Sequence, residues 1–387
     1  MNCVNDFNKL INFINQFPDN FAEKLDKCYH IATKVCPYNS NWYMFSYSQF
    51  ESDFTNPVVR GSRGTVLEII NGKVTRPICL PFYKFNNLGQ EGCDEVNWDN
   101  AEVQLKVDGN LIKVVNIDGK IYVFTNGAWA IQEVYPTGLA GEEPETDGCK
   151  TYWDFVNYCF EKENFDSLSI PENTTLMFEL VGPKTRVIIH YPETKLWFLG
   201  ARDNLTMKEY DRVAFKKENN IPFDIPPTFN INNVEDLEKE LSTWEGDREG
   251  VVICDKDFRR IKVKTDAYKQ LKFIKGEGNF SEKAILDSIL EGTDDDAVAA
   301  FPVLKDKINE IKNKVINRLN SKLEMWKTCQ EMQNELVGTA DEKEARKDFY
   351  FWAREKFSPE DLKIVLLKGS EESVKEVILK TTTLENI

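Results

Sequence analysis

Short runs of alternating apolar and polar residues fill most of the chain, from about Trp42 to Lys272. A period of two is typical of β-strands whose two faces meet different surroundings. Gly, Asn and Asp residues separate the runs, as turns between strands require. The segment from Tyr152 to Phe160 has helical spacing instead. The pattern predicts a domain of antiparallel sheets with flanking helices.

Both ends of the chain show helical periodicity. Before about Ser40, apolar residues spaced by three or four predict one or two short amphipathic helices. From Ser281 onward the steps are again three and four, and the stretch from Ile308 to Trp326 contains neither Pro nor Gly. Further helices are expected near Glu342 to Lys356 and Glu371 to Lys380. The sequence therefore predicts an α+β fold, with residues 1–275 forming the strand-rich domain and residues 276–387 an all-helical C-terminal domain.

Composition indicates a cytoplasmic protein, located in the host cytosol if the source is a virus. The 387 residues contain nine scattered cysteines without a Cys-x-x-Cys pair, as expected for reduced thiols. A membrane span or signal peptide is not expected, because the chain lacks a run of about twenty apolar residues. A monomer is expected, since no long heptad repeat is present.

The charge distribution modifies this picture. A net charge of −15 argues against general binding to nucleic acid, because phosphate contacts require cations. Basic residues are nevertheless concentrated in two parts of the sequence, which predicts one basic cleft on an acidic body. The first group is Arg60, Arg63, Arg76, Lys84, Lys106 and Lys113, and the second runs from Arg259 to Lys264.

The stretch Lys106-Val107-Asp108-Gly109 is the main candidate for chemistry. It follows an apolar alternation and precedes a second predicted strand, Leu111 to Val115. A lysine beside a short acidic-glycine turn can form a covalent bond to a nucleotide, provided that nearby cations activate its amine. An ordinary hairpin whose exposed strand ends at Asp-Gly explains the same residues. Both interpretations remain open at this point.

Downstream charges favour the covalent chemistry. Glu179 and Glu249 interrupt or precede apolar, strand-like runs, where a carboxylate needs a metal ion or a hydroxyl as partner. Lys262 and Lys264 alternate with β-branched residues, so their amines share one strand face and form a candidate phosphate-binding pair. For each strand alone, a solvated face is the simpler alternative.

The order of these motifs resembles that of the covalent nucleotidyltransferases, which include nucleotide-dependent ligases and capping enzymes. Within that group the chain looks like the RNA ligase 1 family of bacteriophages, the type associated with tRNA repair. The similar segments are Ser62-Arg63-Gly64, Arg76 to Asn86, Phe178 to Ile188 and Lys262 to Tyr268. The helical tail also fits this family, whereas DNA ligases and capping enzymes usually carry a small β-barrel after the last lysine motif.

The resemblance implies an ATP-grasp-like nucleotidyltransferase domain and an ATP-dependent RNA ligase activity. RNA 5′-phosphate and 3′-hydroxyl ends, including those of cleaved tRNA, would be joined through lysyl-AMP and an RNA-adenylate. Lys106 would be the nucleophile, and Lys262 and Lys264 would hold the α-phosphate. The other expected ATP-binding residues are Arg63, Lys84, Asp108, Gly109, Glu179, Glu249 and Tyr268. Glu179 and Glu249 would also bind Mg²⁺, with Mn²⁺ as an alternative, and the helical domain would select the RNA.

One position departs from the resembled family. Where that family carries Lys-Gly-Ser after the second strand, this chain has Asn126-Gly127-Ala128, so a cation near the nucleotide is missing. DNA ligase, GTP-using capping enzyme and non-catalytic RNA-binding protein are the alternatives to RNA ligase. The intact set of Lys106, Glu249, Lys262 and Lys264 favours an enzyme.

Overall fold

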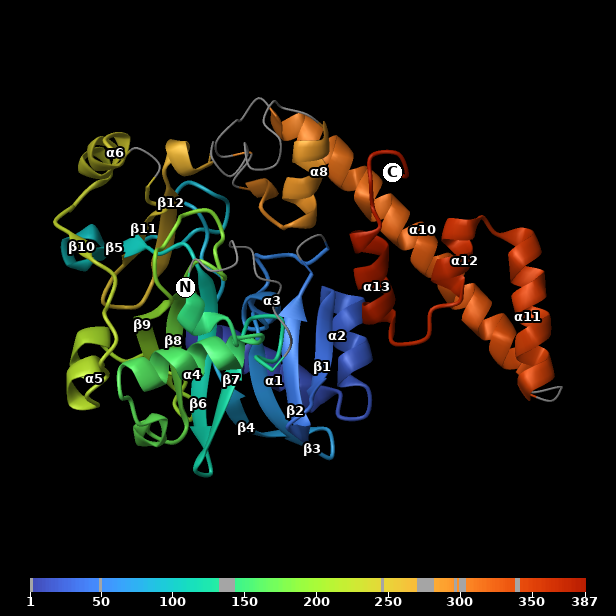
Figure 1. Cartoon of the computed structure of the whole chain (residues 1–387), viewed down its shortest axis with the longest axis horizontal. Coiled ribbons are helices and arrows are strands. Elements are labelled where there is room, and N and C mark those ends of the chain that lie inside the picture. Colours follow the sequence, from blue (N-terminus) through green and yellow to red (C-terminus); the bar gives the residue numbers. More distant parts are fainter. Residues whose placement is uncertain are drawn as a thin grey trace. The chain divides into compact units, whose positions relative to one another are not determined.

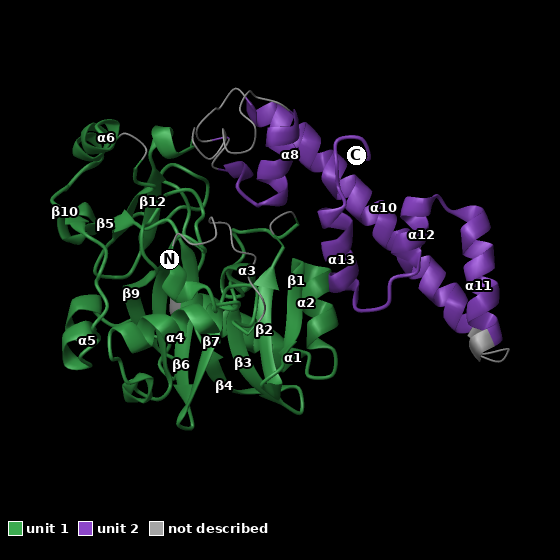
Figure 2. Ribbon diagram, viewed as in Figure 1, with its two compact units in different colours: residues 1–271 green, residues 272–387 purple. Residues whose placement is uncertain are grey.

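The computed structural model describes residues 3–48, 51–131, 143–244, 247–269, 282–295, 298, 304–337 and 342–387. The chain forms two compact units, residues 1–271 and 272–387 (Figure 2). The boundary predicted from the sequence, after residue 275, lies outside the described residues. Each unit is described separately below.

The described part of unit 1 contains three four-stranded antiparallel sheets, labelled in Figure 1. Sheet A has the order β1 (Ile31–Cys36), β2 (Asn39–Tyr47), β3 (Thr65–Ile70), β4 (Lys73–Cys79). Sheet B has the order β10 (Thr228–Phe229), β5 (Glu102–Lys106), β11 (Gly250–Cys254), β12 (Arg260–Lys264). Sheet C has the order β7 (Lys120–Phe124), β6 (Asn110–Ile117), β8 (Thr174–Val181), β9 (Lys195–Asp203). The predicted α+β class with antiparallel sheets is confirmed.

Helices flank these sheets. They are α1 (Cys3–Gln16), α2 (Phe21–Tyr29), α3 (Pro57–Arg60), α4 (Tyr152–Lys162), α5 (Arg212–Glu218) and α6 (Val234–Ser242). Short 3-10 turns cover Trp98–Asn100, Pro144–Thr146 and Ser167–Ser169. Helix α4 begins where predicted because Thr151 and Asp154 form a reciprocal capping box.

Alternating apolar residues give sheets A and C two packed faces each. Helices α1 and α2 cover one face of sheet A, around Leu67. The opposite face, including Met44, packs against Val115 of sheet C. The second face of sheet C, including Phe178, packs against Phe155 of α4, which crosses in front of that sheet in Figure 1. A separate cluster joins sheet B to α6.

A buried charge network ties sheet B to sheet C. The Glu209 carboxylate, in the segment after β9, accepts hydrogen bonds from Arg202 of β9 and Arg260 of β12. All three side chains are buried. Buried charges are tolerated when each is paired and hydrogen-bonded, so this network fixes one position of β12 beside sheet C.

The stretch Lys106-Val107-Asp108-Gly109 is not a hairpin turn. Strand β5, which ends at Lys106, pairs with β10 and β11 in sheet B, whereas the next strand, β6, pairs with β7 and β8 in sheet C. The hairpin interpretation of Asp108-Gly109 is therefore wrong. The stretch carries the chain from one sheet to the other.

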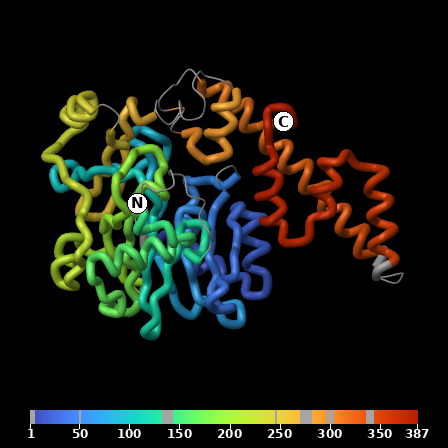
Figure 3. The backbone as a smooth tube through the Cα atoms, in the orientation of Figure 1, coloured from blue at the N-terminus to red at the C-terminus, as the bar shows by residue number. Residues whose placement is uncertain are grey.

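Unit 2 is helical in its described residues. Its helices are α8 (Glu282–Leu290), α10 (Lys305–Val337), α11 (Glu342–Lys356), α12 (Pro359–Val365) and α13 (Glu371–Lys380). The tube in Figure 3 follows α10, against which α8, α11, α12 and α13 all pack. The predicted helical C-terminal region is confirmed, although α12 was not predicted. No described helix combines the length and apolar character needed to cross a membrane.

Candidate active site

Three charged side chains meet where β5, β11 and β12 lie side by side. Gly250, at the start of the central strand β11, is opposite Lys106 on one neighbour and Lys264 on the other. Glu249 precedes it and places its carboxylate between the two lysines. The Glu249 oxygens lie 2.6 Å from Lys106 Nζ and 3.1 Å from Lys264 Nζ. We refer to Lys106, Glu249 and Lys264 as the charged triad.

Strand pairing around the triad depends on glycine at position 250. Gly250 has φ of +153°, and a Cβ there would lie 2.0 Å from the Val263 carbonyl oxygen on β12. Any larger residue would push β12 away from β11. The glycine therefore keeps Lys264 within reach of Glu249.

The two lysines determine the protonation state of Glu249. Burial acts to raise the pKa of this carboxyl, but the charges and hydrogen bonds of Lys106 and Lys264 outweigh burial and leave the pKa below its ordinary value. Glu249 is therefore ionised at neutral pH. Only 3% of its side chain is exposed, whereas 22% of the Lys106 side chain is exposed. Of these two partners, Lys106 is the one that solvent and ligands can reach.

Glu179 of β8 belongs to the same electrostatic environment. Burial raises the pKa of this carboxyl to about 8, an effect opposed by Lys106 and reinforced by Glu249. Asp108 raises the pKa further, and Arg63 lowers it. In the absence of a bound cation Glu179 is mostly protonated at pH 7. Glu249 and Glu179 therefore differ in protonation state although they share one site.

Replacing Glu179 with glutamine should change the pH dependence of stability. Because its pKa rises on folding, the wild-type native state loses stability as pH increases from about 4.5 to about 8. The Glu179→Gln variant cannot ionise at this position, so it should gain stability relative to the wild type across that window. Urea unfolding of the metal-free proteins at both ends of the window measures the difference. The matched control is Glu172→Gln, at an exposed position. If the stability of both variants relative to the wild type were the same at the two pH values, the prediction would be contradicted.

Asp108 anchors the chain around the site. Its Oδ2 accepts hydrogen bonds from the amides of Ile188 and Ile189, each at 2.7 Å, and its Oδ1 accepts one from the Tyr268 hydroxyl at 2.7 Å. Tyr191 accepts a hydrogen bond from the Asp108 amide at 3.3 Å. The Asp108 carboxylate is thus fully engaged with protein donors. In this structure Asp108 holds two segments in place, the loop after β8 and the residues around Tyr268 that follow β12.

Tyr268 lies beside Lys264 of the triad. Its side chain is buried, and Lys264 Nζ lies 5.4 Å from the centre of its ring, a favourable distance for a cation and an aromatic ring. The hydrogen bond from its hydroxyl to Asp108 holds the ring in this position. Its predicted contact with ATP remains a prediction.

Gly109 is required by close approach to β8. A Cβ at this position would lie 2.4 Å from the Leu180 carbonyl oxygen and 3.0 Å from Glu179 Cγ. Real side chains do not tolerate such contacts. The glycine therefore lets the crossing chain pass directly beside Glu179.

Backbone contacts join Lys262 to the segment that follows Lys84. Lys262 is two residues before Lys264 on β12, so both side chains leave the same strand face. The Asn86 carbonyl accepts a hydrogen bond from the Lys262 amide at 3.1 Å. This contact holds the segment after Lys84 along β12, while Lys84 Nζ itself lies 3.1 Å from the centre of the Phe54 ring.

Arg63 lies in the turn between α3 and β3. Its positive charge influences the pKa of Glu179 on β8 and of Lys113 on β6. The described structure therefore relates Arg63 to the triad through Glu179, and shows no direct contact between Arg63 and Lys106.

Several basic residues of the predicted cleft stabilise the fold instead. Arg60 forms a buried, bidentate pair with Asp6. Arg76 pairs with Glu68 and Asp118 on the surface. Arg260 is buried and pairs with Glu209, a carboxylate that it shares with Arg202. Ion pairs with protein carboxylates thus account for the positions of these arginines, and their place in a basic cleft stays a prediction.

Sequence reasoning missed the backbone donors of the site. The amides of Ile188 and Ile189 fix Asp108, and an amide leaves no signature in the side-chain pattern. The fully buried Lys113 was noticed only as one basic residue among many. Its position within the apolar run from Leu111 to Val115 was the signal that could have singled it out.

No cluster of three or more His, Cys, Asp or Glu side chains suited to hold a metal ion occurs among the described residues.

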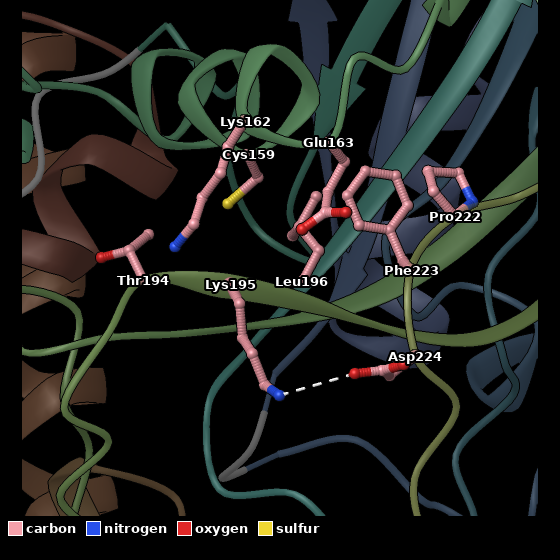
Figure 4. A pocket seen from close by; sticks show the side chains of 9 residues that line it. All are labelled: Cys159, Lys162, Glu163, Thr194, Lys195, Leu196, Pro222, Phe223 and Asp224. Atoms are coloured by element: carbon pink, nitrogen blue, oxygen red, sulfur yellow. Dashed lines mark ion pairs between the residues drawn. The ribbon is translucent and has the colours of Figure 1, made fainter.

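A small pocket lies between α4, β9 and the residues before β10, and no residue of the triad lines it (Figure 4). Lys195 and Asp224 form an ion pair of 3.8 Å at its rim. None of the predicted site residues lines this pocket.

Comparison with known proteins finds a viral relative. No family model matches the chain. A protein of Autographa californica nuclear polyhedrosis virus, described as a proposed bifunctional polynucleotide kinase/RNA ligase, is 26% identical over 337 residues. The match covers 81% of this chain but only 46% of the viral protein, so the chain spans about half the length of this relative. The resemblance to RNA ligases is confirmed.

Solved structures align with the chain at low similarity. An archaeal ATP-dependent RNA ligase aligns over 97% of this chain and 99% of its own, with 12% identity and a TM-score of 0.44. A Naegleria gruberi RNA ligase, solved as a mutant with ATP and Mn, aligns over 44% of this chain and 51% of its own, with 17% identity and a TM-score of 0.33.

Proposed function

We propose that this chain is an ATP-dependent RNA ligase. The observation that supports the proposal most strongly is the charged triad, in which Lys106 Nζ lies 2.6 Å from a buried, ionised Glu249. A partly exposed lysine, held by a buried carboxylate beside a second lysine, is suited to attack a phosphate. The viral relative, described as a kinase/RNA ligase, supports RNA as the substrate.

The first step of the proposed reaction forms lysyl-AMP. Lys106 Nζ transfers a proton to solvent and attacks the α-phosphorus of ATP with the lone pair that this frees. A P–N bond forms, the bond between the α-phosphorus and its bridging oxygen breaks, and pyrophosphate leaves with that electron pair. Glu249, already hydrogen-bonded to the amine, is placed to orient it.

Cations would stabilise the charge that develops in this step. Lys264 and Lys262 are assigned to the α-phosphate, and Arg63 and Lys84 to the outer phosphates. Positioned cations of this kind supply much of the stabilisation in phosphoryl transfer. Glu179 is assigned to the ribose or a metal ion, Asp108 and Gly109 to the shape of the pocket, and Tyr268 to the support of Lys264.

The carboxyl groups present fit a largely hydrated Mg²⁺ better than a fully protein-bound metal. Both Glu249 oxygens already bind lysines, which leaves Glu179 as the available hard oxygen ligand. A cation beside Glu179 would favour its ionised form. When bound, Mg²⁺ or Mn²⁺ would neutralise phosphate charge and draw electrons from the α-phosphorus.

The later steps consume the adenylate. An oxygen of the RNA 5′-phosphate attacks the AMP phosphorus and the P–N bond breaks. Lys106 Nζ leaves with that electron pair and takes up a proton from solvent, which returns the free amine. The RNA 3′-hydroxyl then attacks the activated 5′-phosphate, loses its proton and releases AMP. We assign the choice of RNA, including ends of cleaved tRNA, to the C-terminal domain predicted for residues 276–387. We also propose that the protein acts as a monomer in the cytosol.

Incubation of the wild-type protein with α-labelled ATP and Mg²⁺ tests the proposal. We expect an acid-labile, alkali-stable labelled protein, because a P–N bond has those properties. Addition of 5′-phosphorylated single-stranded RNA should remove the label and yield joined RNA. Labelling by GTP instead would indicate a capping enzyme, transfer only to nicked DNA a DNA ligase, and no labelling a binding protein.

A further inference from the structure

Lys113 is a buried cation that the proposed reaction does not use. It lies in the middle of β6, its side chain is fully buried, and its Nζ donates to the Gly64 carbonyl oxygen at 2.5 Å. Burial lowers the pKa of this amine to about 8; Cys79 opposes the shift and Arg63 adds to it. Lys113 is still mostly charged at pH 7.

Strand register places Lys113 behind the candidate active site. Lys113 is opposite Met177 on β8, and Leu111, two residues earlier, is opposite Glu179. Lys113 and Glu179 therefore lie on one face of sheet C, in successive rows. On the same face, Val115 belongs to the apolar layer between sheets A and C. Along this face, Lys113 thus lies between the apolar layer at Val115 and the row of the candidate active site that contains Glu179.

Lys113 also lies beside the position where the resembled family carries a lysine. A Cβ placed on Gly64 would be 2.7 Å from Lys113 Nζ and 2.6 Å from the Cα and the carbonyl oxygen of Asn126. Lys113 pairs with Phe124 across β6 and β7, and Asn126 follows two residues later. The amine and the asparagine are close neighbours across two adjacent strands.

A purely structural role does not explain a charge at this position. Burying an ammonium group costs more than burying an apolar side chain of the same size, such as methionine. The hydrogen bond to the Gly64 carbonyl holds the peptide group between Gly64 and Thr65, one residue after Arg63. The Asn126 Oδ1 atom is buried without a hydrogen-bond partner among the described residues. The polar groups around Lys113 therefore do not form a complete hydrogen-bond network.

We infer that Lys113 is a positioning residue for nucleotidyl transfer, which supplies from β6 the positive charge missing at Asn126 and fixes Arg63 through the Gly64 carbonyl. This inference rests on the proposed ligase function. Lys113 does not touch the nucleotide, because it is fully buried. It acts through Arg63 and through its field on the phosphate site.

The test removes the positive charge from Lys113 and then restores one at position 126, just after β7. We expect Lys113→Met to reduce the rate of lysyl-AMP formation by roughly 10- to 100-fold, the effect of losing one preorganised cation that does not touch the nucleotide itself. The double variant Lys113→Met with Asn126→Lys should recover most of that loss. Exposed Lys120→Met, on the β6–β7 hairpin, is the matched control and should behave as the wild type. Thermal unfolding of each variant separates loss of folding from loss of rate.

Binding of a non-reactive ATP analogue, followed by calorimetry, provides a second readout. The Lys113→Met variant should bind the analogue more weakly, and Asn126→Lys should restore affinity. A folded Lys113→Met variant with wild-type rate and affinity would overturn the inference, as would a double variant without recovery in either readout. If the wild type forms no adduct, the proposed ligase function fails, while analogue binding still decides the role of Lys113.

Discussion

Replacing Lys106 with alanine should abolish the labelled enzyme adduct, with a loss on the order of 10⁴-fold or more, as expected when a nucleophile is removed. Lys106 is more exposed than Lys264 and Glu249, its two partners in the triad, and its Nζ lies 2.6 Å from Glu249 Oε2. Single-turnover labelling with α-labelled ATP, resolved on a denaturing gel, measures the effect.

Two further variants separate nucleophilic attack from ion pairing at position 106. Lys106→Arg keeps a positive charge opposite Glu249, but a guanidinium stays protonated and cannot attack. It should therefore fold like the wild type and form no adduct. Exposed Lys120→Ala controls for loss of a lysine in the same unit. An adduct at wild-type yield in Lys106→Ala would remove Lys106 from the proposed role.

The main elements of the fold could be predicted because local periodicity determines them. The bounds of α11 and α13 agree with the predicted segments, and strand β12 has the two-residue alternation that put Lys262 and Lys264 on one face. In each case a packed face needs apolar residues at one fixed period. Helix α12 was missed because it is only seven residues long, and its start depends on the Ser358 cap and the proline that follows.

Contacts between sheets could not be predicted in the same way. Asp108-Gly109 has the sequence of a hairpin turn, yet β5 and β6 lie in different sheets. The choice depends on Gly109, whose missing side chain lets the chain pass within van der Waals reach of Leu180, a residue about seventy positions away. Nothing in the local sequence encodes such a distant neighbour.

The same limit applies to charge. Sequence alone grouped Arg60, Arg76 and Lys106 as one basic cleft, but a cation contributes less to a ligand site when one protein carboxylate balances its charge. Asp6 binds Arg60, and Glu68 binds Arg76. Lys106 differs because Glu249 is shared with a second lysine, which leaves the triad with one excess positive charge. That excess is what an incoming phosphate would meet.

Replacing Lys264 with methionine removes this excess and should slow lysyl-AMP formation by about 10²- to 10³-fold, the usual effect of deleting one preorganised electrostatic group. Methionine preserves most of the side-chain volume above the Tyr268 ring, so β12 should keep its position. Glu249 would still bind Lys106, but their charges would cancel. The α-phosphate would then approach a neutral pair instead of a cation.

The loss should appear in the rate of the chemical step at saturating ATP more than in KM, because phosphate charge shifts most in the transition state. Exposed Lys256→Met, in the turn between β11 and β12, is the matched control. If the Lys264→Met rate stays within about twofold of the wild type, Lys264 serves only as an ion-pair partner of Glu249. A loss of rate in Lys264→Met but not in Lys256→Met would instead assign to Lys264 the charge that balances the phosphate. The contact between Lys106 and Glu249 is expected to be the same in both variants.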